Sequence, residues 1–279
     1  MSKKSPIPIG KFFTSSSGFK IHYHEVGTPR PDNPSVIMLH GSGPGASGYS
    51  NFKDNYPLFE KAGYHVIVPD YLGYGLSSKP ADFVYRVENQ IPILRELYAH
   101  TGVTKASILG NSLGGWFALY HAIHHPAEVD KLILMAPGGL EDPSLFVSQM
   151  EGLRELFRIP MERDFTVAAM RKLFDLFMHD AADVTDIVLE ERLEIARQQP
   201  IEVYSTLGGE LSTPRLNEVK APVLVLWGYG DKFVPYRHSQ YLLENIPDVR
   251  MVTSNTAGHW FMVEQPELFN RECLAFLAE

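Results

Sequence analysis

The stretch Gly110-Asn111-Ser112-Leu113-Gly114 decides the fold that we expect for this chain. It fits the pattern G-x-S-x-G and stands between an apolar run that predicts a strand, Ser107–Leu109, and a helical stretch, Trp116–His125. A nucleophile elbow needs this strand–turn–helix context, because flanking glycines leave room for a sharp turn that holds the serine exposed. The pentapeptide alone is a weak signal, but in this context Ser112 is the predicted nucleophile.

A base and an acid for this serine follow two later strands. A serine hydroxyl is a poor nucleophile unless a neighbouring base takes its proton. Of the eleven histidines, His259 is the expected base, because Ala257-Gly258-His259-Trp260 follows the last predicted strand. Asp231 follows the strand before it, and the chain order Ser, Asp, His is that of an α/β-hydrolase. We therefore predict Ser112, His259 and Asp231 as a catalytic triad.

Other histidines and one other aspartate compete for these roles. His121, His124 and His125 lie in or at the end of the helix after the elbow, and we expect them at the surface. Asp70 also follows a strand, but it precedes the serine. We interpret it as structural, with a role in place of Asp231 as the alternative.

A glycine-rich segment, His40-Gly41-Ser42-Gly43-Pro44-Gly45, follows the first buried strand. Glycines there let backbone N–H groups turn toward a developing oxyanion, and the expected pair of donors is the N–H groups of Ser42 and Leu113. An ordinary glycine-rich turn is the alternative. A phosphate-binding loop is disfavoured because no Gly-Lys-Ser/Thr follows.

Short apolar runs recur along the chain and end at Gly or Pro. Such continuous runs predict strands covered on both faces, as in a parallel sheet flanked by helices. An exception is Phe19–His24, which alternates and predicts one strand of an antiparallel hairpin at the edge of the sheet. The runs are Val36–Leu39, Tyr64–Val68, Ser107–Leu109, Lys131–Met135, Pro222–Trp227 and Val249–Val252.

This rhythm stops between about Leu140 and Pro214, where only helical patterns occur. Asp164 is the expected N-cap of a helix carrying Phe165, Ala169, Leu173 and Phe177 on one side, and Thr185 is that of a second helix, which Pro200 ends. We therefore expect one α/β unit with a mostly parallel sheet. Residues 1–139 and 214–279 form its core, and residues 140–213 form a helical cap.

Composition excludes several classes of function. A formal net charge of −8 argues against nucleic-acid or anionic-membrane binding, and the only Lys/Arg run we single out is Lys3-Lys4. Residues 1–10 lack the apolar region of a secretory signal, and no apolar stretch approaches the ~20 residues that span a bilayer. The single cysteine, Cys273, lies on an apolar helical stripe and is expected in the core. We expect a cytoplasmic enzyme with no cofactor and no metal site.

Arg192 has unusual neighbours. In a helix over residues 185–199, the positions three and four residues away are Val188, Leu189, Ile195 and Ala196, all apolar. A guanidinium there needs a partner from elsewhere, and a substrate carboxylate would bind it in a bidentate manner. A snorkelling arginine or a salt bridge to another helix is the alternative. The spacing leaves both readings open.

The sequence resembles the meta-cleavage product hydrolases, which hydrolyse carbon–carbon bonds in aromatic-ring degradation. The resemblance covers essentially the whole chain. Generic esterases share the elbow but rarely combine it with the other motifs. These motifs are Ser42-Gly43-Pro44-Gly45-Ala46, Ser50-Asn51-Phe52, Gly110-Asn111-Ser112, and Gly258-His259-Trp260 followed by Glu264 and Phe269-Asn270.

The resemblance implies a substrate, a 2-hydroxy-6-oxohexa-2,4-dienoate, and a homo-oligomer of two or more chains. In the implied mechanism His259 helps convert the dienol to its keto tautomer, and Ser112 then attacks the distal ketone. The segment before Pro222 is shorter than the resemblance leads us to expect, which leaves the acyl substituent open. The resemblance assigns dienoate binding to Asn51, Asn111, Arg192 and Trp260, and the acyl-side pocket to Phe177, Phe233 and Val234.

Two other functions remain as alternatives. A carboxylesterase or lactonase would use the same triad on an ester, but it would have no evident task for Arg192 and Asn51. A ligand receptor with this fold is disfavoured by the intact triad, although a fold does not fix a function. Haloalkane dehalogenases and epoxide hydrolases resemble this fold with Asp at the nucleophile position, which Ser112 occupies here.

Overall fold

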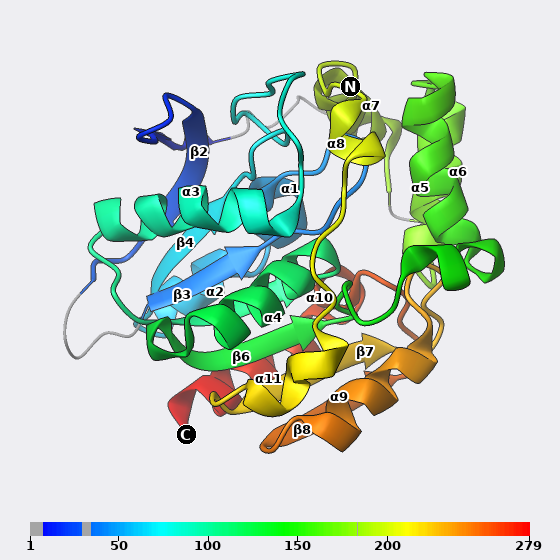
Figure 1. The fold of residues 1–279 in the computed structure, drawn as a ribbon. Coiled ribbons are helices and arrows are strands. Elements are labelled where there is room, and N and C mark those ends of the chain that lie inside the picture. Colours follow the sequence, from blue (N-terminus) through cyan, green and yellow to red (C-terminus); the bar gives the residue numbers. More distant parts are fainter. Residues whose placement is uncertain (1–7, 30–34, 183) are drawn as a thin grey trace.

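The computed structural model describes residues 8–29, 35–182 and 184–279, and its centre is a single sheet (Figure 1). Lys3 and Lys4 lie outside the described residues. Eight strands follow the order β1-β2-β4-β3-β5-β6-β7-β8. They are β1 (Lys11–Thr14), β2 (Lys20–Val26), β3 (Ser35–Leu39), β4 (His65–Pro69), β5 (Ala106–Asn111), β6 (Val129–Met135), β7 (Val223–Gly228) and β8 (Val249–Ser254).

The pairing of the strands confirms the predicted α/β fold. β1 pairs with β2, and β2 with β4, in antiparallel fashion, whereas all other neighbours are parallel. The predicted edge hairpin is therefore present. Every residue of β3, β4, β5 and β7 is buried, as expected for strands covered on both faces.

Helices cover both faces of this sheet. Figure 1 shows α3 and α4 in front of the strands and α11 behind them. α4 begins at Leu113, earlier than the predicted Trp116, because Ser112 is itself the N-cap. The helices of the core are α1 (Gly48–Phe52), α2 (Tyr56–Lys61), α3 (Val87–His100), α4 (Leu113–His124), α9 (Ser239–Asn245), α10 (Phe261–Glu264) and α11 (Pro266–Ala278).

Four α-helices lie in the chain between β6 and β7. They are α5 (Glu151–Glu162), α6 (Val167–Phe177), α7 (Asp186–Ala196) and α8 (Glu202–Ser205), and no strand interrupts them in the described part of this segment. In Figure 1 the arrowheads of β3, β6 and β7 point toward the side of the molecule where α5 and α6 stand. A cap over the carboxyl ends of the strands is the arrangement that the sequence predicts, and its exact boundaries stay a prediction.

Short 3-10 helices fill the connections, at Pro126–Glu128, Pro143–Leu145, Val147–Gln149, Thr213–Glu218 and Tyr236–His238. Cys273 is fully buried in the core, as predicted. No helix in the described part of the chain is long and apolar enough to cross a membrane.

Three local predictions are wrong or need a change. Asp164 is not the N-cap of α6, because Thr166 caps it by accepting a hydrogen bond from the Ala169 N–H, while the Asp164 carboxylate binds Arg158. Thr185 does stand at the N-cap of α7, but its side chain makes no capping bond. That helix ends at Ala196, before it reaches Pro200.

The third prediction that the structure contradicts is the surface position of His121. Only 1% of this residue is exposed, and its Nε2 lies 3.0 Å from a Glu128 carboxylate oxygen. Burial lowers the pKa of His121 to about 4. His124 and His125, at the end of the same helix, are partly exposed. The buried histidine is thus a packing residue with a carboxylate partner.

Candidate active site

Ser112 stands at a strained turn between β5 and α4. Its backbone has φ 55° and ψ −113°, a conformation that residues other than glycine rarely adopt. The two glycines of the elbow are required by close packing. A Cβ on Gly110 would lie 2.3 Å from the Gly114 oxygen, and one on Gly114 would lie 2.1 Å from the Leu39 oxygen. The strand, the turn and the helix therefore fit together only with glycine at both places.

His259 and Asp231 meet at the ends of β8 and β7. His259 Nδ1 lies 2.8 Å from Asp231 Oδ2, and both side chains are buried. The other carboxylate oxygen, Oδ1, accepts hydrogen bonds from the N–H groups of Phe233 (2.7 Å) and Val234 (3.0 Å). Because each oxygen has its own donors, the carboxylate is fixed in orientation and can hold the imidazole in one tautomer.

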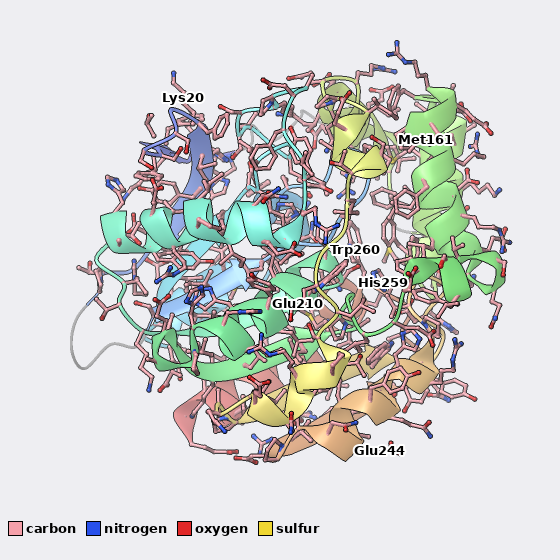
Figure 2. The ribbon with its side chains drawn as sticks, viewed as in Figure 1. Lys20, Met161, Glu210, Glu244, His259 and Trp260 are labelled. Carbon is pink, nitrogen blue, oxygen red and sulfur yellow. The ribbon has the colours of Figure 1, made fainter. Side chains whose placement is uncertain are left out.

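The loop that carries His259 is bound to its surroundings on two sides. The Asn111 side-chain amide donates to the His259 carbonyl oxygen at 3.3 Å, and Asn111 is the residue before Ser112. From the cap, the Phe177 carbonyl oxygen accepts the His259 N–H at 2.8 Å. Figure 2 shows His259 and Trp260 together between the strands and the helices α5 and α6. The elbow and the histidine loop are thus held to each other.

The two expected oxyanion donors lie at one cavity with Ser112. This cavity has a volume of about 310 Å³, and Ser42, Ser112 and Leu113 all line it. Leu113 is the first residue of α4, so its N–H has no acceptor within the helix. Gly43, next to Ser42, has φ 123°, which glycine tolerates and other residues do not.

Arg192 is buried in a way that leaves most of its guanidinium without a partner. Only 3% of the residue is exposed, and Nη1 donates to Ser50 Oγ at 3.1 Å. Nε and Nη2 have no hydrogen-bond partner, and no carboxylate of the described residues pairs with Arg192. Burial lowers its pKa to about 10, so the group is still charged at neutral pH. This geometry does not fit a snorkelling arginine or a cross-helix salt bridge.

Of the other residues expected to bind the dienoate, only Trp260 contacts this arginine. Trp260 faces Arg192, whose guanidinium carbon lies 5.4 Å from the centre of its ring, and both line a second cavity of about 490 Å³. Asn51 instead supports the glycine-rich loop, since its Oδ1 accepts the Gly41 N–H at 3.4 Å. The Oδ1 of Asn111 has no partner and packs against Gly41. Neither cavity contains both Ser112 and Arg192.

Two of the three residues expected in the acyl-side pocket line the cavity at Ser112, and the third packs against one of them. Phe233 and Val234 line the cavity at Ser112. Phe177 does not line it, but its ring stacks on that of Phe233 with the centres 4.2 Å apart. Sequence reasoning missed Trp116, Leu156 and other lining residues, which are Phe146, Leu153, Phe157, Leu207 and Leu211. Of these only Trp116 has a local signal, because it stands one helical turn after Ser112.

Metal ligands are not gathered in this site. Across the part of the chain that the structure describes, no group of three or more His, Cys, Asp and Glu side chains is placed to hold a metal ion. The arrangement of a strained serine, a buried His–Asp pair and a cavity with backbone donors defines the class of α/β-hydrolases.

Comparisons with known proteins narrow this class. Residues 36–272 match the model of the alpha/beta hydrolase family. A 2-hydroxy-6-oxo-6-phenylhexa-2,4-dienoate hydrolase of Comamonas testosteroni is 36% identical over 94% of this chain and 93% of the relative. A 2-hydroxy-6-oxononadienedioate/2-hydroxy-6-oxononatrienedioate hydrolase of the same species is 34% identical, over 100% of this chain and 99% of the relative.

A solved structure agrees with these relatives. The meta-cleavage product hydrolase of Pseudomonas fluorescens IP01 superposes with a TM-score of 0.82 and 27% identity, covering 97% of this chain and 98% of that one. The chain belongs to the alpha/beta hydrolase family and, within it, to the meta-cleavage product hydrolases. It is an enzyme, a hydrolase that acts on a small molecule, and the ligand-receptor alternative is set aside.

Proposed function

We propose that this enzyme hydrolyses a carbon–carbon bond in a 2-hydroxy-6-oxohexa-2,4-dienoate, with Ser112, His259 and Asp231 as its catalytic triad. The observation that carries the proposal is the buried guanidinium of Arg192, with Nε and Nη2 unpartnered. A buried charge without a partner is costly, and a substrate carboxylate would supply the missing acceptors. The names of the relatives support a dienoate as the source of that carboxylate.

The proposed reaction has two halves. His259 first assists the shift of the 2-hydroxy proton to carbon 5, which gives the keto tautomer. Ser112 Oγ then adds to the carbon 6 carbonyl while His259 takes its proton, and the N–H groups of Ser42 and Leu113 hold the oxyanion. Breaking the bond between carbons 5 and 6 leaves the acyl group on Ser112. The electron pair goes to the dienol fragment, which takes the proton from His259 and leaves as 2-hydroxypenta-2,4-dienoate.

Water completes the reaction. With His259 as base, it hydrolyses the acyl-enzyme to a carboxylic acid and restores Ser112. In both halves the positive charge that develops on His259 is stabilised by Asp231, whose oxygen lies 2.8 Å from Nδ1. Asn51 and Asn111 then act on the substrate side mainly through the loops that they hold.

The cavity at Ser112 favours a bulky apolar acyl substituent. Its volume of about 310 Å³ exceeds the roughly 150 Å³ that suffices to bind benzene in an apolar site. Its charged lining is Arg86, Glu141 and Asp142, so acidic groups outnumber basic ones. Arg86 is also paired with Glu88 at 3.1 Å. Glu141 is likewise paired, with Arg237 at 3.0 Å. A second carboxylate on the acyl side would find no unpaired cation among these described lining residues, whereas a phenyl group would meet aromatic and aliphatic side chains.

The esterase alternative is tested through Arg192. We expect Arg192→Ala to lower kcat/KM for a dienoate by about 2–4 kcal/mol of transition-state stabilisation. Arg192→Lys should recover little, because an ammonium cannot form the bidentate fork. Hydrolysis of p-nitrophenyl acetate, which has no carboxylate to bind, should change little. Spectrophotometric assays of both substrates measure the two losses.

A matched control comes from the end of the same helix. Arg197 follows α7 and is exposed, and among the described residues its side chain bonds only the Phe165 carbonyl oxygen, so Arg197→Ala should change neither activity. Equal losses on dienoate and ester in Arg192→Ala would make Arg192 a structural residue and would remove the main support for a dienoate substrate. A cytoplasmic location and a homo-oligomer stay predictions from the sequence and the family resemblance.

A further inference from the structure

The segment that carries one oxyanion donor, residues 41–46, is held at several points. We call it the oxyanion loop. His40 Nδ1, in the preceding residue, donates to the Gly41 carbonyl oxygen at 2.7 Å. Of the bonds to more distant residues, three come from the core and one from the cap. They join Gly41 N to Asn51 Oδ1 (3.4 Å), Ser42 Oγ to Tyr74 Oη (2.8 Å), the Ala46 oxygen to Gly75 N (3.0 Å) and Gly45 N to Gln199 Oε1 (2.8 Å). The bond from the cap is therefore made by a single side chain, that of Gln199.

The amide of Gln199 is buried and bonded at both ends. Its Oε1 accepts the Gly45 N–H and the Tyr204 hydroxyl, each at 2.8 Å. Its Nε2 donates to the carbonyl oxygen of Gly73 at 3.0 Å. Gly73 stands in the same turn as Tyr74, which bonds Ser42. Gln199 thus joins both loops that surround the backbone of Ser42.

The oxyanion loop also lies directly on the helix that carries Arg192. A Cβ on Gly45 would lie 2.0 Å from the Arg192 carbonyl oxygen, so no side chain separates the two backbones. A Cβ on Gly43 would lie 3.9 Å from Arg192 Nη2 and 3.6 Å from Leu156, which lines the Ser112 cavity. The loop is therefore the layer between α7 and the nucleophile, and a small shift of α7 would move the Ser42 N–H.

From these contacts we infer that Gln199 is a positioning residue for the oxyanion hole. Its bond to Gly45 fixes the oxyanion loop against the cap, with the Ser42 N–H directed at the place where the oxyanion forms. The inference rests on the proposed function only in the roles of Ser112 and of the Ser42 N–H, which a dienoate and an ester would share. It does not depend on which of them is the natural substrate.

The test compares Gln199→Leu with Gln199→Glu. We expect Gln199→Leu to lower kcat by about 10- to 100-fold, on a 6-phenyl dienoate and on p-nitrophenyl acetate alike. KM should change by less than about threefold, because the lost interaction matters mainly in the transition state. Gln199→Glu keeps an oxygen for the Gly45 N–H and gives up only the bond to the Gly73 carbonyl oxygen, so it should lose clearly less of kcat than Gln199→Leu. A merely structural residue would not give this rescue.

Controls separate the possible outcomes. Gln198→Leu changes the exposed neighbour, whose side chain, among the described residues, bonds only the Glu194 carbonyl oxygen of α7, and should leave kcat unchanged. If Gln199→Leu does not fold, Tyr204→Phe removes one hydrogen bond from Oε1 and should lower kcat by a smaller factor on both substrates. Unchanged kcat in Gln199→Leu, or equal losses in the Leu and Glu variants, would overturn the inference. If the wild type turns over no dienoate, the proposed function fails, while the ester assay still tests Gln199.

Discussion

Two buried His–Asp pairs in this molecule have nearly the same geometry. His259 Nδ1 and His22 Nδ1 each lie 2.8 Å from an aspartate Oδ2, of Asp231 and Asp70 respectively. In both pairs the side chains are at most 2% exposed. Distance and burial therefore do not distinguish the proposed catalytic pair from the other one, and any difference must come from what surrounds each pair.

The two aspartates are used differently. Asp231 Oδ1 accepts N–H groups only from the next few residues of its own turn. Asp70 instead joins distant segments, since Oδ1 accepts the Gly48 N–H at 2.7 Å and Oδ2 accepts the Leu76 N–H at 2.9 Å. A Cβ on Gly75 would lie 1.9 Å from Asp70 Oδ2, so this loop wraps closely around the carboxylate. Asp70 is thus a support for the loops beneath the oxyanion loop.

The two imidazoles differ even more. His22 Nε2 has no hydrogen-bond partner among the described residues, and a Cβ on Gly10 would lie 2.3 Å from it, so backbone covers this nitrogen. His259 lies beside Phe233, which lines the Ser112 cavity, and its loop is bonded to Asn111. We propose that His259 and Asp231 form the catalytic pair because the His259 loop is bonded to the elbow and His259 lies beside Phe233 of the Ser112 cavity, a cavity that His22 does not line.

The largest expected effect comes from removing the nucleophile beside one pair. We expect Ser112→Ala to lower kcat by about 10⁴- to 10⁶-fold while leaving dienoate binding largely intact. Stopped-flow spectra of the bound substrate and steady-state rates measure the two quantities. Near wild-type turnover in this variant would end the assignment of Ser112.

The other pair offers a matched control in Ser77. Its hydroxyl accepts a hydrogen bond from the backbone N–H of His22 at 2.9 Å and donates one to the backbone carbonyl oxygen of Asp70 at 2.7 Å. Ser77→Ala should therefore cost about 1–2 kcal/mol of stability, the usual loss for a buried hydrogen-bonded hydroxyl, and should leave kcat nearly unchanged. A large loss of kcat with an intact fold would mean that the second pair takes part in catalysis.

Replacing each aspartate by asparagine should separate the pairs next. We expect Asp231→Asn to lower kcat by up to ~10⁴-fold with little loss of stability, because the amide holds the imidazole in the wrong tautomer. Asp70→Asn should keep most of kcat and lose stability instead. Rates and urea unfolding of both variants decide between them. If the Asp70→Asn variant folded and had the lower kcat of the two, Asp70 and not Asp231 would be the acid of the triad.

Sequence reasoning succeeded where a short segment fixes its own geometry. The elbow at Ser112, the buried strands and the edge hairpin each follow from a local pattern of glycine, apolar and alternating residues. The roles of His259 and Asp231 follow from chain order, because parallel strands bring their carboxyl ends to one edge of the sheet. Their hydrogen bond agrees with this reasoning, and their catalytic roles stay a prediction.

Sequence reasoning failed where a contact joins distant segments. His121 is buried and lies within hydrogen-bond distance of Glu128. Its position along the helix does not reveal this partner. Asp164 and Thr166 are both good N-caps, and the choice depends on Arg158 binding the aspartate. Gln199 carries no signal at all, because its importance comes from Gly45 and Gly73, more than 100 residues earlier in the chain.

The last prediction concerns how the stability contributed by the His22–Asp70 pair depends on pH. Burial would raise the pKa of Asp70, but the hydrogen bond from His22 and the nearby charges of His22 and His40 lower it overall. The folded state therefore prefers the ionised form, and this preference stabilises the fold above the unfolded pKa of about 3.9. The contribution is lost as the pH falls through the lower pKa of the folded state.

Asp70→Asn removes this contribution at every pH. We expect it to lower the free energy of unfolding by about 1–3 kcal/mol at pH 7, because an amide nitrogen cannot accept the hydrogen bonds that Asp70 Oδ2 accepts. At neutral and mildly acidic pH the difference from the wild type should be constant. Below the unfolded pKa it should shrink, because the wild type then loses the same interaction by protonation. Urea unfolding at pH 7, 5 and 3.5 measures this trend, and an equal difference at all three values would show that Asp70 supports its loops without its charge.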